Sequence, residues 1–322
     1  MLAPTTFFGF KCPEIDRTPE QGEFIESLQS LRKYSRQKGK VVGFRGVTIR
    51  QTDGEGGEEM LVGAEWNEEA ACFMVEEARA NLPEGDAMQM AVHEWERDVY
   101  IPAHNHAASD QEKYAFLDLW AGRHLEDLIE MKSEQVQLTT YSVVMDFERS
   151  RGYIGSSNLG KASDVLAVLQ TLLKPLISVE HNWDEDAGLM VFPGLMDLVR
   201  DWLITGAAEA PWLLGRSCTI KGSRGEKIAY DKSQLDLDSI REYLVSGEDM
   251  KVVACELILK GPSGEMGDSL TAVVSKGGAI SRFTNSLVTD GAQDPYGIHA
   301  ICWLASRYLD ALQDSADKAA GD

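Results

Sequence analysis

The sequence predicts an α+β fold with mixed and antiparallel sheets and grouped helices. Two observations favour this class. Apolar segments of strand length follow one another across short glycine turns, as at 270–275 and 279–283. Amphipathic helical segments lie in groups between strands instead of alternating with each strand, which distinguishes the pattern from a doubly wound parallel sheet. No internal repeat or low-complexity tract is present.

The clearest elements lie after residue 135, where we place a boundary between an N-terminal region, 1–135, and a second region, 136–322. A strand at 136–147, a turn at 150–152 and a strand at 153–156 precede an amphipathic helix at 164–173, which Pro175 ends. This order predicts a β-β-α unit. Further helices are predicted at 195–205, 238–246 and 298–312, and further strands at 218–220, 227–230, 251–260, 270–275 and 279–283.

The N-terminal region opens with an apolar run at 7–10 and a helix that begins near Pro19. A strand at 40–50 follows, and the glycine-rich turn at 53–57 joins it to an apolar run at 60–64, which predicts a hairpin. We expect an acidic helix at 67–81 and another helix at 114–131. The role of the mixed stretch 86–130 is left open.

The composition is that of an ordinary globular protein, with 322 residues, 43% apolar and 26% charged. No stretch approaches the roughly 20 apolar residues of a membrane span, and the N-terminus lacks the pattern of a signal peptide. We therefore expect a cytoplasmic protein without a membrane partner. The five cysteines are scattered, odd in number and without CxxC spacing, which argues against a disulfide framework or a zinc knuckle and predicts that most of them are core thiols.

Charge is distributed very unevenly along this chain of net charge -21. The stretch 27–52, here called the basic strip, contains no Asp or Glu, and the rest of the chain carries -28. Such a strip on an acidic body is typical of a site for a polyanion; the alternative is a solvated helix face followed by a basic edge strand. We expect it to span a helix and the adjoining strand. Its seven basic residues are Arg32, Lys33, Arg36, Lys38, Lys40, Arg45 and Arg50.

One string has the spacing of a phosphate-binding P-loop, from Gly155 to Lys161. Ala162 stands where a Ser or Thr hydroxyl should bind Mg²⁺, and the preceding strand belongs to a hairpin instead of a parallel sheet. We therefore interpret the string as a helix N-terminus capped by Ser157 or Asn158.

Other polar strings are weaker. His104, Asn105 and His106 spell a nuclease motif, but the nearby His and acidic residues have no recognised metal-ligand spacing, so we expect an exposed loop. The acidic string 184–186 beside His181 is typical of a turn. The tryptophans at 202, 212 and 303 lie among apolar residues, and we assign them to the core. Glutamates around Gly54 and Gly57 argue against a phosphate cradle there.

The second region resembles the family of the recombination-associated protein RdgC over residues 125–313. The resemblance rests on the order of the elements and on local strings, without a single catalytic motif. These are TYSVVM at 140–145 turning into Tyr153, KASDVLAVL at 161–169, LVRDW at 198–202, KVV at 251–253, VVSKGGAISRF at 273–283 and LDAL at 309–312.

The resemblance implies a non-enzymatic protein that forms a closed dimeric ring, holds DNA in a positively lined hole without reading its sequence, and obstructs a RecA-type recombinase. The chain departs from the family at 65–84 and 126–134, which are acidic here. Lys251 and Arg282 stand where the family also carries Lys and Arg.

We therefore expect a DNA-binding toroidal homodimer in the nucleoid, with no catalytic residue, metal or cofactor. The expected phosphate contacts are the seven residues of the basic strip together with Lys251 and Arg282. Two alternatives stay open: an acidic inhibitor that mimics DNA and docks on a recombination or defence enzyme, and a P-loop ATPase. The enzyme opposed, the cellular or mobile-element origin, and the preference for double or single strands are also open.

Overall fold

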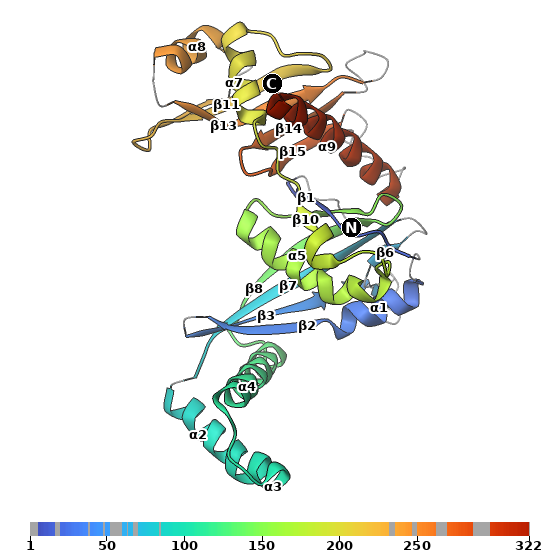
Figure 1. Cartoon of the computed structure of the whole chain (residues 1–322), viewed down its shortest axis with the longest axis vertical. Helices are drawn as coiled ribbons and strands as arrows, with labels where there is room; N and C mark the ends of the chain where they lie inside the picture. The colour runs from blue at the N-terminus through green and yellow to red at the C-terminus, as the bar shows by residue number, and fades with distance from the viewer. Residues whose placement is uncertain are drawn as a thin grey trace. The chain divides into compact units, whose positions relative to one another are not determined.

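The computed structural model describes residues 6–16, 20–37, 39–47, 49–51, 60–62, 64–66, 70–83, 85–231, 236–246, 250–261, 269–285 and 297–321 (Figure 1). It is an α+β protein whose described strand pairs are antiparallel, which confirms the predicted class. None of its described helices is long and apolar enough to cross a bilayer.

The chain divides into two compact units, neither of which is continuous in sequence. Unit 1 comprises Met1–Pro19, Glu65–Phe73 and Ser142–Asp322, and unit 2 comprises Glu20–Ala64 and Met74–Tyr141. The two compact units are defined by contacts and do not test whether the regions 1–135 and 136–322 fold independently, so the boundary at residue 135 stays a prediction.

Unit 1 contains strands in the order β10-β1-β9, followed by Ser142–Asp146 of β8 and Ala70–Phe73 of β7, and β6 also pairs with β7. Helix α5 lies beside this sheet, and the Asn158 side chain accepts a hydrogen bond from the Lys161 amide at its N-terminus. The predicted β-β-α unit and the Asn158 cap are therefore confirmed. The strands and helices are β1 (Phe8–Lys11), β6 (Ala64–Trp66), β7 (Ala70–Asn81), β8 (Gln137–Asp146), β9 (Arg151–Ile154), β10 (Gly188–Leu189), α5 (Leu159–Leu173), a 3-10 turn (Lys174–Leu176) and α6 (Trp183–Asp186).

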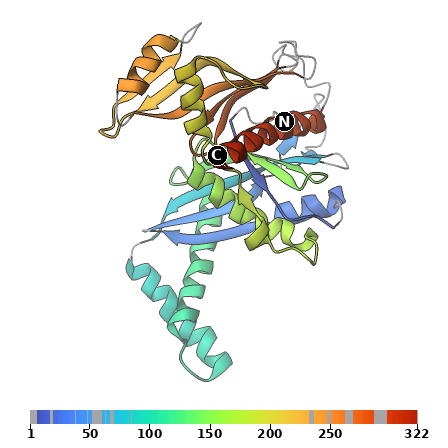
Figure 2. The same cartoon turned by 45° about the horizontal axis from the view of Figure 1, so that its top comes forward.

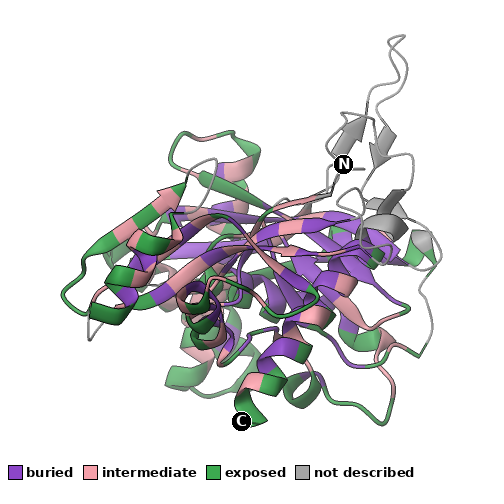
Figure 3. Cartoon of the chain, turned by 90° about the horizontal axis from the view of Figure 1, so that it is seen from above, coloured by how far each residue is buried: buried purple, intermediate pink, exposed green. Residues whose placement is uncertain are grey.

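A second sheet in unit 1 has the order β12-β11-β13-β14-β15. Most of its elements follow the prediction, but β11 begins six residues before the predicted start at 218, and α9 continues nine residues beyond the predicted end at 312. Tyr308 of α9 packs on the sheet: its hydroxyl donates to the Leu257 carbonyl at 2.9 Å and its ring meets Trp212 edge to face. The elements are α7 (Leu195–Thr205), β11 (Trp212–Lys221), β12 (Lys227–Asp231), α8 (Leu237–Ser246), β13 (Lys251–Leu259), β14 (Leu270–Ser275), β15 (Ile280–Asn285) and α9 (Gly297–Gly321). Figure 3 shows buried residues gathered along the strands.

Unit 2 contains the other parts of these two strands, Gln137–Tyr141 of β8 and Met74–Asn81 of β7, followed by β3 and β2, with α4 packed on β2 and β3. The helix buries Ala121, Leu125 and Leu128 against Val41 and Ala78. Figures 1 and 2 show α2 and α4 as neighbouring helices, and Trp95 of α2 stacks on Phe116 of α4 at 4.6 Å. The elements are α1 (Gln21–Ser30), β2 (Arg32–Gln37), β3 (Lys40–Val47), α2 (Gly85–Trp95), a π-helix (Glu96–Tyr100), α3 (Ile101–His104) and α4 (Asp110–Glu130).

The short strands β4 (Ile49–Gln51) and β5 (Met60–Val62) pair with each other, as the predicted hairpin requires. The turn expected at 53–57 lies outside the described residues.

The acidic helix expected at 67–81 is wrong, because residues 70–81 form β7. This strand is buried along most of its length, and its two central carboxylates have partners from neighbouring strands: Glu76 pairs with Arg45, and Glu77 accepts from the Tyr141 hydroxyl at 2.9 Å. Burial between two strands outweighs the helix propensity of Ala and Glu.

Candidate nucleic-acid interface

The first part of the basic strip forms the β2–β3 hairpin of unit 2. Its register pairs Arg32 with Arg45 and Gln37 with Lys40. The expectation that Arg32, Lys33 and Arg36 lie on a helix is therefore wrong. Helix α1 ends at Ser30, and Leu31 is already extended, with φ -62° and ψ 113°.

Tyr34 fixes one face of β2 against α4. Its ring lies so close to Gly43 of β3 and Gly122 of α4 that a Cβ at either glycine would approach ring atoms to 2.7 and 2.6 Å. Its hydroxyl donates to Glu126 Oε1. Burial, followed by this hydrogen bond, raises the pKa of Tyr34. Because side chains alternate along a strand, Arg32 and Arg36 lie on the same face as Tyr34.

Each of three arginines of the basic strip meets a carboxylate. Arg36 Nε lies 2.6 Å from Asp118 Oδ1 of α4, and Arg45 lies 2.6 Å from Glu76 of β7. Arg32 Nε lies 3.1 Å from Glu126 Oε1. The pairs differ in exposure: the Asp118 side chain is 48% exposed, whereas that of Glu76 is only 10% exposed. Both arginine side chains are partly buried, at 19% exposed for Arg36 and 25% for Arg45, so the difference lies in the carboxylates. We therefore regard the Arg45–Glu76 pair as part of the packing of the sheet, and Asp118 as an exposed partner that another anion can displace from Arg36.

These carboxylates are the residues that sequence reasoning missed. Asp118 and Glu126 are eight positions apart, close to the repeat that places two side chains on one helix face. That spacing is the signal for an acidic stripe, but only the fold shows that the stripe faces the arginines of β2.

The remaining residues of the basic strip are Lys33, Lys38, Lys40 and Arg50. Lys33 and Lys40 are exposed, and within the described part of the chain no carboxylate lies within ion-pair distance of Lys40. Lys38 lies outside the described residues. Arg50 belongs to β4, and its side chain is likewise outside them. Strand β2 ends the order of its sheet, so the alternative of a basic edge strand describes the backbone correctly.

Lys251 and Arg282 belong to unit 1, whereas the basic strip belongs to unit 2. Lys251 begins β13, is exposed and pairs in register with Lys221. Arg282 lies on β15 with φ 53° and contacts Asp231 at 3.4 Å.

The P-loop-like string has no free lysine at its end. Lys161 Nζ lies 3.3 Å from Asp164 Oδ2, one turn further along α5. Such a pair on an exposed helix face is typical of ordinary helix stabilisation.

His104 and His106 end α3 and the turn after it. The Nδ1 atoms lie 3.0 Å from the Tyr100 carbonyl and 2.9 Å from the Ala107 carbonyl. Within the described residues, no three His, Cys, Asp or Glu side chains cluster in a way that could hold a metal ion.

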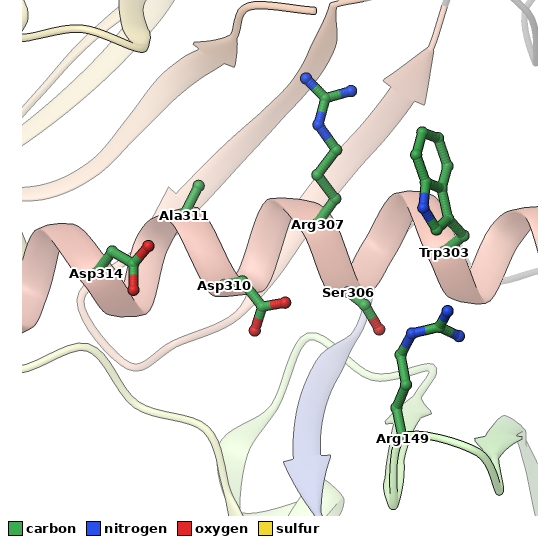
Figure 4. A pocket seen from close by; sticks show the side chains of 7 residues that line it. All are labelled: Arg149, Trp303, Ser306, Arg307, Asp310, Ala311 and Asp314. Carbon is green, nitrogen blue, oxygen red and sulfur yellow. The ribbon is translucent and has the colours of Figure 1, made fainter. Parts of the chain in front are cut away.

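A shallow cavity of about 360 Å³ lies between α9 and the turn after β8 (Figure 4). Its guanidinium groups are already engaged, because Arg149 contacts Asp146 at 3.0 Å and Arg307 donates to the Lys260 carbonyl at 2.7 Å. Asp310 and Asp314 also line it, which disfavours a phosphate. The assignment of Trp303 to the core is wrong: it borders this cavity and is 46% exposed. The other two tryptophans assigned to the core are buried, as predicted.

Comparison with known proteins adds no family to the description of this chain, which therefore rests on its fold and its charge distribution. No protein-family model matches the sequence, and no match was found among curated proteins. The chain is thus defined by its α+β fold, its two compact units and a basic hairpin flanked by carboxylates.

Proposed function

We propose that this protein binds DNA without reading base sequence, through phosphate contacts made by the β2–β3 hairpin and the rest of the basic strip. In the full proposal two copies close a ring around DNA and obstruct a RecA-type recombinase or a nuclease there. The protein itself performs no chemistry.

The observation that carries the proposal is the segregation of charge. Seven basic residues and no acidic ones occupy 27–52 of a chain with net charge -21. Much of the strip folds into adjacent antiparallel strands, so its side chains project from one small element. An acidic body repels DNA except where such an element offers cations, and phosphate contacts carry no sequence information.

The Arg36–Asp118 pair is compatible with this role because its carboxylate is half-exposed, although the Arg36 side chain is only 19% exposed. An exposed ion pair contributes about 0.2 to 1 kcal/mol, so a phosphate can replace Asp118 at Arg36 at modest cost. Glu76 is more buried than Asp118, so we expect its pair with Arg45 to persist in the complex. The phosphate contacts are then Arg32, Lys33, Arg36, Lys38 and Lys40, with Arg50, Lys251 and Arg282 as further candidates.

The ring and the opposed enzyme rest on the resemblance of residues 125–313 to the RdgC family. A two-fold ring is the simplest closed assembly, and closure holds DNA by topology in addition to affinity. A protein threaded on DNA blocks the advance of a filament-forming recombinase.

The alternative is an acidic inhibitor that docks on a basic protein surface. It is favoured by the segment 85–134, which has eleven acidic residues and four Lys or Arg. Met90, Tyr114, Leu119 and Met131 in this segment are each more than 60% exposed, and Asp118 already binds an arginine within the chain. Such a surface suits a protein partner better than DNA.

A binding titration separates the two functions. Fluorescence anisotropy with unrelated duplexes of equal length, at two salt concentrations, should give equal affinities that fall steeply with salt. Binding confined to one sequence would contradict the proposal, and absence of DNA binding at low salt would favour the protein-docking inhibitor.

A further inference from the structure

Two buried cysteines face each other across the middle of the second sheet of unit 1. Cys218 of β11 and Cys255 of β13 are register partners in an antiparallel pair, 2% and 0% exposed. Residues directly opposite in such a pair have Cα atoms about 4.5 to 5.5 Å apart. That separation falls within the range of about 4.4 to 6.8 Å found across disulfides. The two sulfur atoms can therefore be joined with little movement of the backbone.

The Cys255 thiol donates to the Glu256 carbonyl at 3.6 Å. The neighbouring Cys218 side chain, together with complete burial, raises the pKa of Cys255 well above the ordinary value. All five cysteines are free and buried. A raised pKa keeps the Cys255 thiol protonated and slow to react in the closed sheet, and both thiols of the pair are buried, so their oxidation depends on local opening.

The sheet has an irregularity beside this pair. Leu214 faces Leu257, and the next partners are Cys218 and Cys255, so three residues of β11 stand against Glu256 alone. The Glu256 carboxylate accepts hydrogen bonds from the amides of Arg216 and Ser217, the latter at 3.1 Å. One side chain thus holds backbone groups that the ladder leaves unpaired, and the bulge interrupts the β11–β13 pairing directly beside the two cysteines.

We propose that Cys218 and Cys255 form a reversible cross-strand disulfide when the protein meets a hydroperoxide, and that the bulge at Glu256 is where the sheet opens to admit it. One thiol, as thiolate, attacks the peroxide oxygen, which breaks the O–O bond and gives a sulfenic acid and one water. The second sulfur then displaces the hydroxyl as another water, forming the S–S bond. Two thiols and one hydrogen peroxide become one disulfide and two waters.

The test is peptide mapping of the whole folded chain after treatment with hydrogen peroxide and alkylation of remaining thiols. Trypsin separates the two cysteines into peptides 217–221 and 252–260. We expect a linked species two hydrogen atoms lighter than the sum of the two peptides, which dithiothreitol removes. Cys218→Ala and Cys255→Ala should each abolish it, whereas Cys72→Ala, which removes another buried thiol, should leave it.

The wild-type map decides the proposal even if a variant fails to fold. Linkage of other cysteines, or oxidation to sulfinic acid without the linked species, would overturn it. Glu256→Ala frees the two amides of the bulge and should speed linkage several-fold, with Glu226→Ala, an exposed residue of the neighbouring turn, as the control. Equal rates in the two variants would overturn the bulge as the route of entry. The oxidised protein should also melt several degrees higher than the reduced one.

Discussion

The guanidinium of Arg36 and the carboxylate of Asp118 lie 2.6 Å apart, joining the basic hairpin to an otherwise acidic helix. Arg36 also lies over the ring of Tyr114, 5.6 Å from its centroid. Asp118 therefore competes with any phosphate that approaches Arg36, and its removal distinguishes the two candidate functions.

We predict that Asp118→Asn raises affinity for DNA about two- to fivefold, the equivalent of one exposed ion pair. Asp127→Asn is the matched control, because it changes net charge equally on the exposed side of the same helix. Titration by anisotropy measures both. Equal gains in the two variants would mean that only overall charge matters, and a loss of binding to a protein partner would favour the inhibitor.

Reversal of charge at Arg36, Lys38 and Lys40 together should weaken binding to all DNA sequences alike. For about six neutralised phosphates, log K should fall against log salt with a slope near -5, and the variant should give a shallower slope. The control reverses Lys221, Arg224 and Lys227, three exposed basic residues around the β11–β12 turn. Unchanged binding in the first variant would move the site elsewhere.

Lys161→Ala should leave DNA binding intact. We expect neither the wild-type protein nor this variant to hydrolyse ATP. Lys161 pairs with Asp164, and Ala162 supplies no hydroxyl for Mg²⁺. A coupled phosphate-release assay with and without Mg²⁺ checks this. ATP turnover that depends on Lys161 would overturn the non-enzyme proposal.

Acid should weaken the start of α4 through Glu112. Hydrogen bonds from Ser109 and Tyr100 lower the pKa of this carboxyl to about 2, below its ordinary value near 4.5. Its stabilising effect is thus complete above the unfolded pKa and is lost as pH falls through the folded one, between about 4.5 and 2.

Glu112→Gln should therefore flatten the pH dependence of thermal unfolding in that window. Because Ser109 is part of the capping box, Ser109→Ala should lower the free energy of unfolding by about 1 kcal/mol. Unfolding curves from pH 7 to 2 measure both effects, with Asp110→Asn as the control on the same turn. A wild-type slope that survives in Glu112→Gln would refute the assignment.

The homodimer has a topological test. A closed ring should stay on covalently closed circular DNA at high salt but leave linear DNA through its ends, whereas a monomer in a groove would leave both at the same rate. Sedimentation at micromolar concentration should show a particle of twice 35.5 kDa. A monomer that releases both forms of DNA alike would exclude the toroid.

Much of the fold could be predicted because the hydrophobic periodicity of its helices and strands is visible in the sequence. The β-β-α unit, α7, α8 and the strands of the second sheet combine clear alternation or helical spacing with Gly or Pro at their ends. Strand β7 could not be predicted, because Glu76 and Glu77 are typical of an exposed helix face. Their partners Arg45 and Tyr141, which allow them to be buried in a strand, are far away in the sequence.

The candidate site was predicted in composition but not in geometry. Charge identified the basic residues, yet Arg32 and Arg36 were assigned to a helix because the preceding residues keep helical spacing up to Leu31. The contact of Tyr34 with Gly43 and Gly122 fixes the strand instead, and it joins residues far apart in sequence. No local pattern reports such a contact, nor the carboxylates that accompany it.

The position of β2 at the end of its sheet order gives its cations a second task. A terminal strand presents unpaired amide and carbonyl groups on which a strand from another molecule can add, and charged side chains along it oppose that addition. Arg32, Lys33 and Arg36 repel their counterparts on a second β2, whatever else they bind. Replacing them by glutamine would therefore test colloidal stability as much as affinity: such a variant should aggregate with time, whereas charge reversal should keep the edge protected.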